Sequence, residues 1–238
     1  MTPPRYSIVV PCYNEESSLR PLLEGFARLG EKDLEVILVD NGSSDGTAAE
    51  LERLLPLYPF ASAVRVPVNK GYGFGILSGL AAASGEYVGW MHGDLQFDPA
   101  AAAATAALAE KTGGGKVFVK GLRRGRPLLD KFFTAAMSLF ETLLMGTRLE
   151  DINGQPTLFH RSLMETWTAP PPDFSLDLYA YVSAARAGFR IARFEVVNSE
   201  RRRGTSSWNA GLWSRLRLAL RMAAASVRVR AAAPGKMK

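Results

Sequence analysis

Apolar and polar positions follow two different rhythms along the first hundred residues of the chain. Four short runs are almost continuously apolar and end in turn residues, which predicts strands that are buried on both faces. These runs are residues 6–14, 34–40, 62–68 and 86–91. The stretches between them favour helices, most clearly from Leu19 to Leu29, and also near residues 48–55 and 76–84. Strands that alternate with helices predict βαβ units and a mostly parallel α/β sheet.

The pattern is less regular in the second half of the chain. An alanine-rich helix is expected first, and a second helix is expected to end near Gly188. One strand is expected to run into a basic loop, a short strand follows residues DINGQP, and a further strand follows the second helix. In chain order these segments are residues 99–111, 116–127, 151–161, 175–189 and 190–197.

Two further segments are amphipathic. A wide apolar stripe at helical spacing runs from Phe132 to Leu144; core packing is its favoured interpretation, and contact with a membrane is the alternative. From Trp208 onward, leucines share one side of a helix and arginines the other, which is typical of a helix in a lipid headgroup layer. We therefore expect an α/β domain over residues 1–207. Residues 208–238 are expected to form a basic amphipathic helix and tail that anchors on a membrane surface.

The positive charge of the chain is concentrated at its C-terminal end. Residues 201–238 contain ten Lys or Arg and no Asp or Glu, whereas the preceding residues contain 19 basic and 23 acidic side chains. A basic segment is typical of a contact with an anionic membrane, of a contact with nucleic acid or of a disordered tail, and the charge alone does not decide between them. No nucleic-acid recognition motif accompanies it, so we expect a membrane partner and no nucleic acid.

Cysteine usage and targeting signals bear on the cellular compartment. Cys12 is the single cysteine and cannot form an internal disulfide, which favours a reducing, cytoplasmic compartment. The first residues lack the pattern of a signal peptide. No stretch reaches the roughly 20 uninterrupted apolar residues that a membrane span needs. The sequence therefore predicts a cytoplasmic protein that is peripheral at the cytoplasmic face of the membrane.

Polar motifs follow three of the predicted strands. They are PCYNE at residues 11–15, DNGSSDG at residues 40–46 and HGD at residues 92–94. Because the carboxyl ends of parallel strands meet at one edge of a sheet, and ligands bind there, these motifs are expected to form one site.

Four motifs together resemble a known family. They are VVPCYNEE at residues 9–16, VDNGSSDGT at 39–47, NKGYGFGILSGLAAASGEYV at 69–88 and GDLQ at 93–96. Their order and spacing resemble the inverting family 2 glycosyltransferases, and most closely the dolichol-phosphate mannose synthase branch, whose members glycosylate polyprenyl phosphates. The resemblance continues more loosely to about residue 207. It implies a GT-A, Rossmann-like fold, a nucleotide-sugar donor and a role in cell envelope glycan biosynthesis.

In that family, the residues that match Pro11, Tyr13, Glu15 and Asp40 line the nucleotide pocket, so a GDP- or UDP-sugar is the expected donor. A carboxylate at the end of a buried strand can accept hydrogen bonds from a base or a ribose. Packing is the alternative role for Tyr13, and capping a turn or helix is the alternative for Asp40. Gly93 lies beside the expected diphosphate site.

Two other features of these motifs have a structural interpretation. Asp45 is expected to cap a helix rather than to bind a ligand. Gly71, Gly73 and Gly75 resemble a phosphate-binding loop, but we interpret them mainly as close-packing residues.

The HGDLQ segment is the candidate metal site. The resemblance aligns it with an Asp-x-Asp-x-Gln segment whose polar groups hold a divalent ion, Mn²⁺ or Mg²⁺, against the diphosphate. Asp94 and Gln96 match, whereas His92 replaces the first acid. A neutral imidazole can still ligate a metal and suits Mn²⁺ better than Mg²⁺. The alternative is that His92 only hydrogen-bonds a phosphate or a loop carbonyl.

Two arginines match phosphate-contacting residues of the synthases. They are Arg123 in GLRR and Arg201 in RRRGTSS. A guanidinium suits phosphate because it donates two parallel hydrogen bonds. Ser207 stands where the family often has lysine, and residues 151–156 (DINGQP) depart from the usual D-x-T-S-G-F-R. These departures leave open an acceptor or sugar that differs from the best-known cases.

The acceptor determines how much acid–base catalysis is needed. A polyprenyl phosphate is already an anion, so positioning and electrostatic stabilisation suffice. A hydroxyl of a glycan or lipid needs a base, for which Asp177 is the first candidate and Asp173 a weaker one, unless either only caps its helix. The leading hypothesis is an inverting glycosyltransferase that acts on polyprenyl phosphate. The alternatives are a hydroxyl-directed enzyme and a noncatalytic protein that binds sugar nucleotides.

Overall fold

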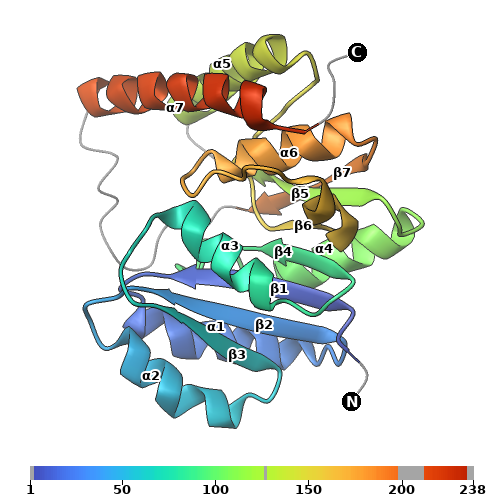
Figure 1. Cartoon of the computed structure of the whole chain (residues 1–238). Helices are drawn as coiled ribbons and strands as arrows, with labels where there is room; N and C mark the ends of the chain where they lie inside the picture. Colours follow the sequence, from blue (N-terminus) through green and yellow to red (C-terminus); the bar gives the residue numbers. More distant parts are fainter. Residues whose placement is uncertain (1–2, 126–127, 198–211, 235–238) are drawn as a thin grey trace.

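The structure, a computed structural model, describes residues 3–125, 128–197 and 212–234, and within these ranges it does not describe the side chains of Leu129 and residues 212–219. Strands and helices alternate from the start of the chain, as the hydrophobic pattern predicts (Figure 1). The strands are β1 (Tyr6–Cys12), β2 (Leu34–Asn41), β3 (Ala61–Val66), β4 (Tyr87–Trp90), β5 (Val117–Arg124), β6 (Thr157–His160) and β7 (Arg190–Val197).

Helices fill the connections between these strands, and one more follows the last strand. They are α1 (Glu16–Leu29), α2 (Thr47–Leu54), α3 (Tyr72–Ala82), α4 (Ala100–Lys111), α5 (Leu128–Met145), α6 (Leu176–Arg186) and α7 (Leu212–Ala232), with short 3₁₀ helices η1 (Leu55–Leu57) and η2 (Arg161–Thr166). None of the helices in the described ranges has the length and apolar character needed to cross a membrane.

The strands form one mixed sheet in the order β3-β2-β1-β4-β6-β5-β7. β1, β2, β3 and β4 are parallel, and β5 is parallel to β7, whereas β6 runs antiparallel to both of its neighbours. The register pairs Cys12 with Asp40, so β1 and β2 end side by side. The mostly parallel sheet brings the ends of β1, β2 and β4 to one edge, as predicted from the sequence.

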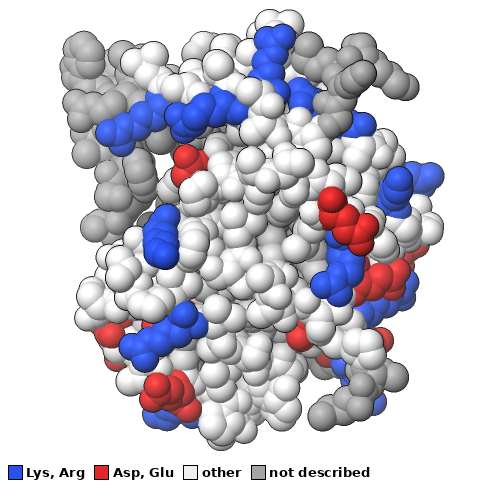
Figure 2. All heavy atoms as spheres, in the orientation of Figure 1, with Lys and Arg blue, Asp and Glu red and all other residues white. Residues whose placement is uncertain are grey.

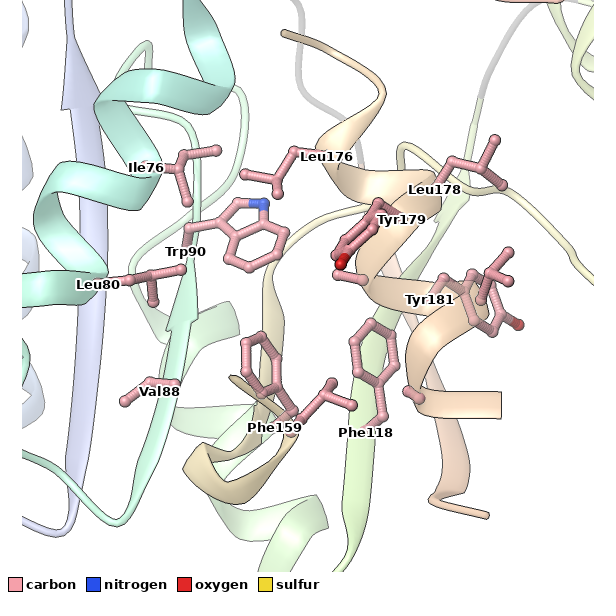
Figure 3. Close-up of a cluster of buried hydrophobic side chains, with 14 of the residues drawn as sticks. Ile76, Leu80, Val88, Trp90, Phe118, Phe159, Leu176, Leu178, Tyr179 and Tyr181 are labelled. Carbon is pink, nitrogen blue, oxygen red and sulfur yellow. The ribbon is translucent and has the colours of Figure 1, made fainter. Parts of the chain in front are cut away.

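The sheet divides the core into two layers because successive side chains of a strand point to opposite faces. Ile8, Val10 and Leu38 pack against α1, α2 and α4 on one face. Val9 and Val39 pack on the other face with α3 and α6. Figure 3 shows the centre of this second layer, where Trp90 and Phe159 meet residues from α3, β5 and α6: Ile76, Leu80, Phe118, Leu176, Leu178, Tyr179 and Tyr181.

Two boundaries differ from the sequence prediction. The stretch 69–75 was expected to be a loop, but α3 already begins at Tyr72 within it. Arg123 and Arg124 were expected in a loop and instead are the last two residues of β5, where strand pairing with β7 extends to Val197. In both cases tertiary packing overrides local sequence preference.

Helices α5 and α7 lie side by side next to α6, on the opposite side of the molecule from α2 (Figure 1). The buried side of α7 is formed by Ala225, Ser226 and Val229, and Ala233 is buried just after the helix ends. The predicted leucine face is therefore not the packed one where it is described, since Leu220 is exposed.

The core interpretation of the Phe132–Leu144 stripe is wrong for the residues on the side of the helix that faces solvent. Leu144 packs partly against the core, but Phe132 and Leu143 are 68% and 75% exposed. Leu128 and Leu139 are exposed on the same side, since spacings of four and seven residues return to one face of a helix.

Candidate functional site

The candidate site lies at the edge where β1, β2 and β4 end. Each strand passes into a polar segment, and hydrogen bonds join the segments after β1 and β2 through Asn14 and Ser44. A methyl group at Gly93 would lie 3.0 Å from Cγ1 of Val10 and 3.5 Å from Sγ of Cys12. This absence of a side chain lets the segment after β4 pack directly on the end of β1. The structure thus brings Gly93 together with the last residues of β1.

The residues expected on the donor side differ in exposure and in hydrogen bonding. Tyr13 is 49% exposed, which argues against a packing role. Glu15 accepts a hydrogen bond from the Ser18 hydroxyl at 2.8 Å. Asp40 is buried, and its Oδ1 accepts from the Ser43 amide at 3.0 Å. Asp40 therefore does stabilise its turn, and no hydrogen bond to another described residue engages its Oδ2. Pro11, half-buried, completes this group of candidates.

Asp45 caps two helices, as the sequence indicates. Its Oδ1 accepts from the amide and hydroxyl of Thr47 at the start of α2, and its Oδ2 accepts from the amide of Glu16 at the start of α1. Burial by itself raises the pKa of Asp45, but these hydrogen bonds outweigh it and hold the pKa below its usual value.

The glycines at the start of α3 are close-packing residues. A side chain on Gly71 or Gly73 would meet the backbone of residues 171–173, and one on Gly75 would meet the Asn41 side chain. The amide of Phe74 donates to the Pro172 carbonyl at 2.9 Å. That carbonyl occupies a donor at the helix start that a phosphate would otherwise use.

The candidate metal segment is a tight turn after β4. Asp94 is buried, and its Oδ1 accepts from the amide of Gln96 at 3.1 Å. Leu95, between them, has a left-handed backbone with φ of 59°. His92 is half-buried, and its ring lies 5.5 Å from that of Tyr72 and 6.4 Å from that of Phe97.

This segment fits a cation that binds mainly to a substrate. Among the described residues, no group of three or more His, Cys, Asp or Glu side chains could hold a metal on its own. A Mg²⁺ or Mn²⁺ ion that is bound with a diphosphate needs only one or two protein carboxylates, because phosphate oxygens and water complete its shell. Asp94 offers one such carboxylate, and Gln96 and His92 are the further candidate ligands in the segment.

Left-handed backbone at residues other than glycine occurs, among the described residues, at this edge. Three residues other than glycine have a left-handed φ: Asn14 beside Tyr13, Leu95 in the metal segment and Asp151 beside Arg123. This region is costly for a branched side chain such as leucine, by about 1 kcal/mol or more. Asn and Asp adopt this region more readily, so the strain lies at Leu95 in the candidate metal segment. Strained backbone recurs at ligand-binding sites.

Arg123 is fixed by a residue that the sequence analysis did not select. The Asp151 carboxylate accepts from the Arg123 amide at 2.8 Å and from its Nε at 2.9 Å, and it also contacts Nη2. Burial raises the pKa of Asp151, but the Arg123 guanidinium outweighs burial and keeps that pKa low. Asp151 is the first residue of DINGQP. This motif departs from the family pattern, but it still supplies an acid that orients Arg123.

Asp177 is not placed as a general base would be. It is 2% exposed, and its Oδ1 accepts a hydrogen bond from Nζ of Lys120 at 2.8 Å. The Tyr72 hydroxyl donates to its Oδ2 at 3.2 Å. Both oxygens are thus engaged inside the protein. Burial lowers the pKa of Lys120, and the charge of Asp177 opposes that effect.

Asp173, the weaker candidate base, caps α6. Its Oδ1 accepts from the Ser175 amide at 2.9 Å, and its Oδ2 lies 3.6 Å from Nη2 of Arg228 on α7. The cap interpretation of Asp173 therefore has structural support. Arg201, Ser207 and Trp208 lie outside the described residues.

Sequence reasoning missed Lys120, Tyr72, Gln155 and Asp151. A lysine inside the apolar run VFVKG was the available signal for a buried charge, because such a residue needs a paired acid. The other three lie in segments without regular periodicity, so the fold alone brings them to the site.

Comparison with known proteins gives a consistent set of relatives. Residues 7–162 match the model of the family described as glycosyl transferase family 2. Undecaprenyl-phosphate 4-deoxy-4-formamido-L-arabinose transferase of Proteus mirabilis is 28% identical over 86% of this chain and 63% of its own length. The same-named protein of Pseudomonas fluorescens is 31% identical over 68% of this chain and 49% of its own length. The chain thus spans less than two thirds of these relatives.

Solved structures share the fold over nearly the whole chain. A mannosyltransferase from Pyrobaculum calidifontis in complex with GDP-Man and Mn²⁺ is 22% identical with a TM-score of 0.65, covering 98% of this chain and 74% of its own. Glucosyl-3-phosphoglycerate synthase from Mycobacterium tuberculosis, in complex with Mn²⁺, UDP and glucosyl-3-phosphoglycerate, is 22% identical with a TM-score of 0.71, covering 98% of this chain and 82% of its own. The sheet and its flanking helices therefore form the GT-A fold that the sequence motifs predict.

Proposed function

Because the chain belongs to glycosyl transferase family 2, we propose that it transfers a sugar from a nucleoside-diphosphate sugar to a polyprenyl phosphate, with inversion at the anomeric carbon. The observation that carries the acceptor assignment is the similarity, over 86% of this chain, to a transferase named for undecaprenyl phosphate. A GDP- or UDP-sugar is the proposed donor, since structures of the same fold were solved with GDP-Man or UDP.

The donor site is proposed at the edge formed by β1, β2 and β4. Tyr13 and Asp40 would contact the base and ribose, with Pro11 and Glu15 completing the pocket. Asp94, Gln96 and His92 would hold a divalent cation with the diphosphate, beside Gly93. Such a cation offsets negative charge on the leaving nucleoside diphosphate.

The chemical step needs little proton transfer. A phosphate oxygen of the acceptor attacks the anomeric carbon as the bond from that carbon to the nucleoside diphosphate breaks. Arg123, oriented by Asp151, would donate to the acceptor phosphate. Arg201 is proposed as a second phosphate contact from the sequence alone. The buried ion pair of Asp177 favours this reaction over transfer to a hydroxyl, which would require a free base.

A peripheral position on an anionic membrane, at its cytoplasmic face, is the proposed location. The exposed apolar side of α5 would enter the headgroup layer. Figure 2 shows Lys and Arg side chains gathered along α7, and the exposed arginines in its described part are Arg221, Arg228 and Arg230. Apolar and cationic groups at one end of the molecule are the combination that binds an anionic bilayer.

A donor and acceptor screen tests the function. The protein is incubated with GDP- and UDP-sugars, Mn²⁺ and either undecaprenyl or dolichyl phosphate, and the lipid products are analysed by mass spectrometry. We expect one donor to give a sugar–phosphate–lipid, and Asp94→Ala or excess chelator to abolish it. Formation of the same product in chelator would refute the metal assignment, and its absence with every donor would refute the proposed acceptor.

A further inference from the structure

A buried polar network joins the two halves of the site. Nζ of Lys120 on β5 donates to Oγ1 of Thr157 on β6 and to Oδ1 of Asp177 on α6, both at 2.8 Å. Lys120 and Asp177 are 0% and 2% exposed. A buried ion pair is a poor way to gain stability, because desolvation offsets most of the attraction. Because this ion pair lies beside the candidate site, we expect it to position another side chain rather than to add stability.

The network ends on the hydroxyl of Tyr72. That hydroxyl donates to Oδ2 of Asp177 at 3.2 Å and accepts from the amide of Gln155. Tyr72 is the first residue of α3, on the donor side of the site, whereas its two partners come from α6 and from the segment before β6. The hydroxyl is thus fixed by residues from the other half of the sheet.

The ring of Tyr72 carries this constraint to the metal segment. It stacks on Phe174, with ring centres 4.6 Å apart, and it also contacts the ring of His92 at 5.5 Å. The imidazole of His92 has a second aromatic contact, with Phe97 at 6.4 Å. Few orientations of the imidazole preserve both contacts, because neighbouring aromatic rings restrict its rotation.

We infer that Tyr72 is a positioning residue for the divalent-cation site: Asp177, paired with Lys120, and Gln155 fix its hydroxyl, and its ring restricts the orientation of the His92 imidazole. This assignment rests on the proposed function, because it requires that a cation and a diphosphate bind at the segment 92–96. It gives Asp177 a role in which both of its oxygens accept hydrogen bonds, in place of proton transfer. Residues that contact and orient metal ligands commonly change metal affinity by about 10- to 100-fold.

The test measures Mn²⁺ affinity by calorimetry in the presence of saturating UDP or GDP, whichever binds. Tyr72→Phe removes the hydroxyl and keeps the ring, whereas Tyr72→Leu removes both. Tyr87→Phe is the matched control, because its buried hydroxyl accepts from the Gly115 amide at the far end of β4. We expect about a 10-fold or larger loss of Mn²⁺ affinity in Tyr72→Leu, a smaller loss in Tyr72→Phe, and a change below about twofold in the control.

A double-mutant cycle separates this role from general stability. If Tyr72 acts through the imidazole, Tyr72→Leu should have little further effect on Mn²⁺ affinity in a His92→Ala background. The same loss in both backgrounds, or wild-type affinity in Tyr72→Leu, would overturn the assignment. If wild type binds the nucleotide with no contribution from Mn²⁺, the metal part of the proposed function fails, and the role of Tyr72 fails with it.

Discussion

At the level of single residues, the ion pair of Lys120 and Asp177 limits which chemistry the proposed site can perform. A carboxylate that accepts two protein hydrogen bonds inside the core cannot take a proton from an acceptor without breaking them. Asp177→Asn alone is a poor test of a base, because it leaves the Lys120 cation buried without its counter-ion. Breaking a buried pair in this way costs about 3–5 kcal/mol of stability.

The double variant Lys120→Met/Asp177→Asn avoids that problem. It removes both charges, and the asparagine oxygen can still accept from the Tyr72 hydroxyl. We expect it to fold and to keep transfer to polyprenyl phosphate within about tenfold of wild type, in contrast to the 10²–10⁴-fold loss that removal of a general base causes. Rate measurements with a circular dichroism control distinguish these results. A folded variant with a loss in the larger range would restore Asp177 as a base.

Arg123 offers a second test at this scale. Lysine keeps the charge but lacks the fork that binds Asp151 and a phosphate together. For Arg123→Lys we expect a higher KM for the lipid phosphate and unchanged thermal stabilisation by UDP or GDP. Arg124→Lys is the matched control, because Arg124 pairs with Glu195 at the exposed edge. Weaker nucleotide binding in Arg123→Lys would place this arginine on the donor side instead.

Sequence motifs located the candidate residues at the strand ends but not the residues that support them. Asp40, Asp94 and Arg123 are found from motifs, since each follows or ends an apolar run. Asp151 and Gln155 have no such context, because their position depends on a loop that packs against β5. The partner of a carboxylate depends on the fold, so the ion pair of Asp177 was not predictable from its motif.

At the level of elements, the contact between α5 and α7 depends on a buried acid. Glu141 on α5 is 3% exposed and accepts a hydrogen bond from the Ser226 hydroxyl on α7 at 3.1 Å. Burial raises the pKa of Glu141 to about 7, although the Ser226 hydrogen bond partly opposes this. The protonated acid suits this interface better than the carboxylate does.

The free energy of unfolding should therefore fall as pH rises from about 4.5 to about 7–8. Because the folded-state pKa is above the unfolded value, the contribution of Glu141 is fully present below about pH 4.5 and is lost by pH 7–8, up to about 3 kcal/mol. Glu141→Gln keeps an oxygen for Ser226 and removes the charge. We expect urea denaturation to find the variant more stable than wild type at pH 8 and similar at pH 5. Equal stability differences at both pH values would contradict this account.

The pattern of hydrophobic residues predicted the two helices but not which side of each is packed. On α5, periodicity identified an apolar stripe wide enough to serve both the core and a surface. On α7, the small residues Ala225 and Ser226 are buried while Leu220 stays exposed. Small side chains permit close helix contact, and only the tertiary arrangement shows that Leu220 faces outward.

At the level of the whole molecule, α5 and α7 give one end of the protein an apolar and basic surface. Phe132→Ser/Leu143→Ser should weaken co-sedimentation with anionic liposomes and leave the melting temperature nearly unchanged, because both side chains are exposed. Leu57→Ser, at another exposed apolar position, is the control and should bind as wild type does. Equal binding by both variants would exclude α5 as the membrane contact.

The overall fold was the most predictable feature. Strand–helix alternation specified the parallel half of the sheet, and the motif order indicated the GT-A fold. The antiparallel β6 was expected as a short strand, but its place between β4 and β5 could not be read from the sequence. Strand order in the second half depends on long-range pairing, which local patterns do not encode. The proposed division at residue 207 stays a prediction, although Val229 and Ala233 pack in the same core as α6.

The most direct test compares two acceptors that differ in one group. With the active donor and Mn²⁺, the initial rate is measured for a short polyprenyl phosphate and for the corresponding polyprenol, and the anomeric configuration of the product is read by NMR. The account predicts transfer to the phosphate with inversion and no detectable transfer to the alcohol. Transfer to the alcohol at a comparable or higher rate would contradict the central claim that the acceptor supplies its own anionic nucleophile.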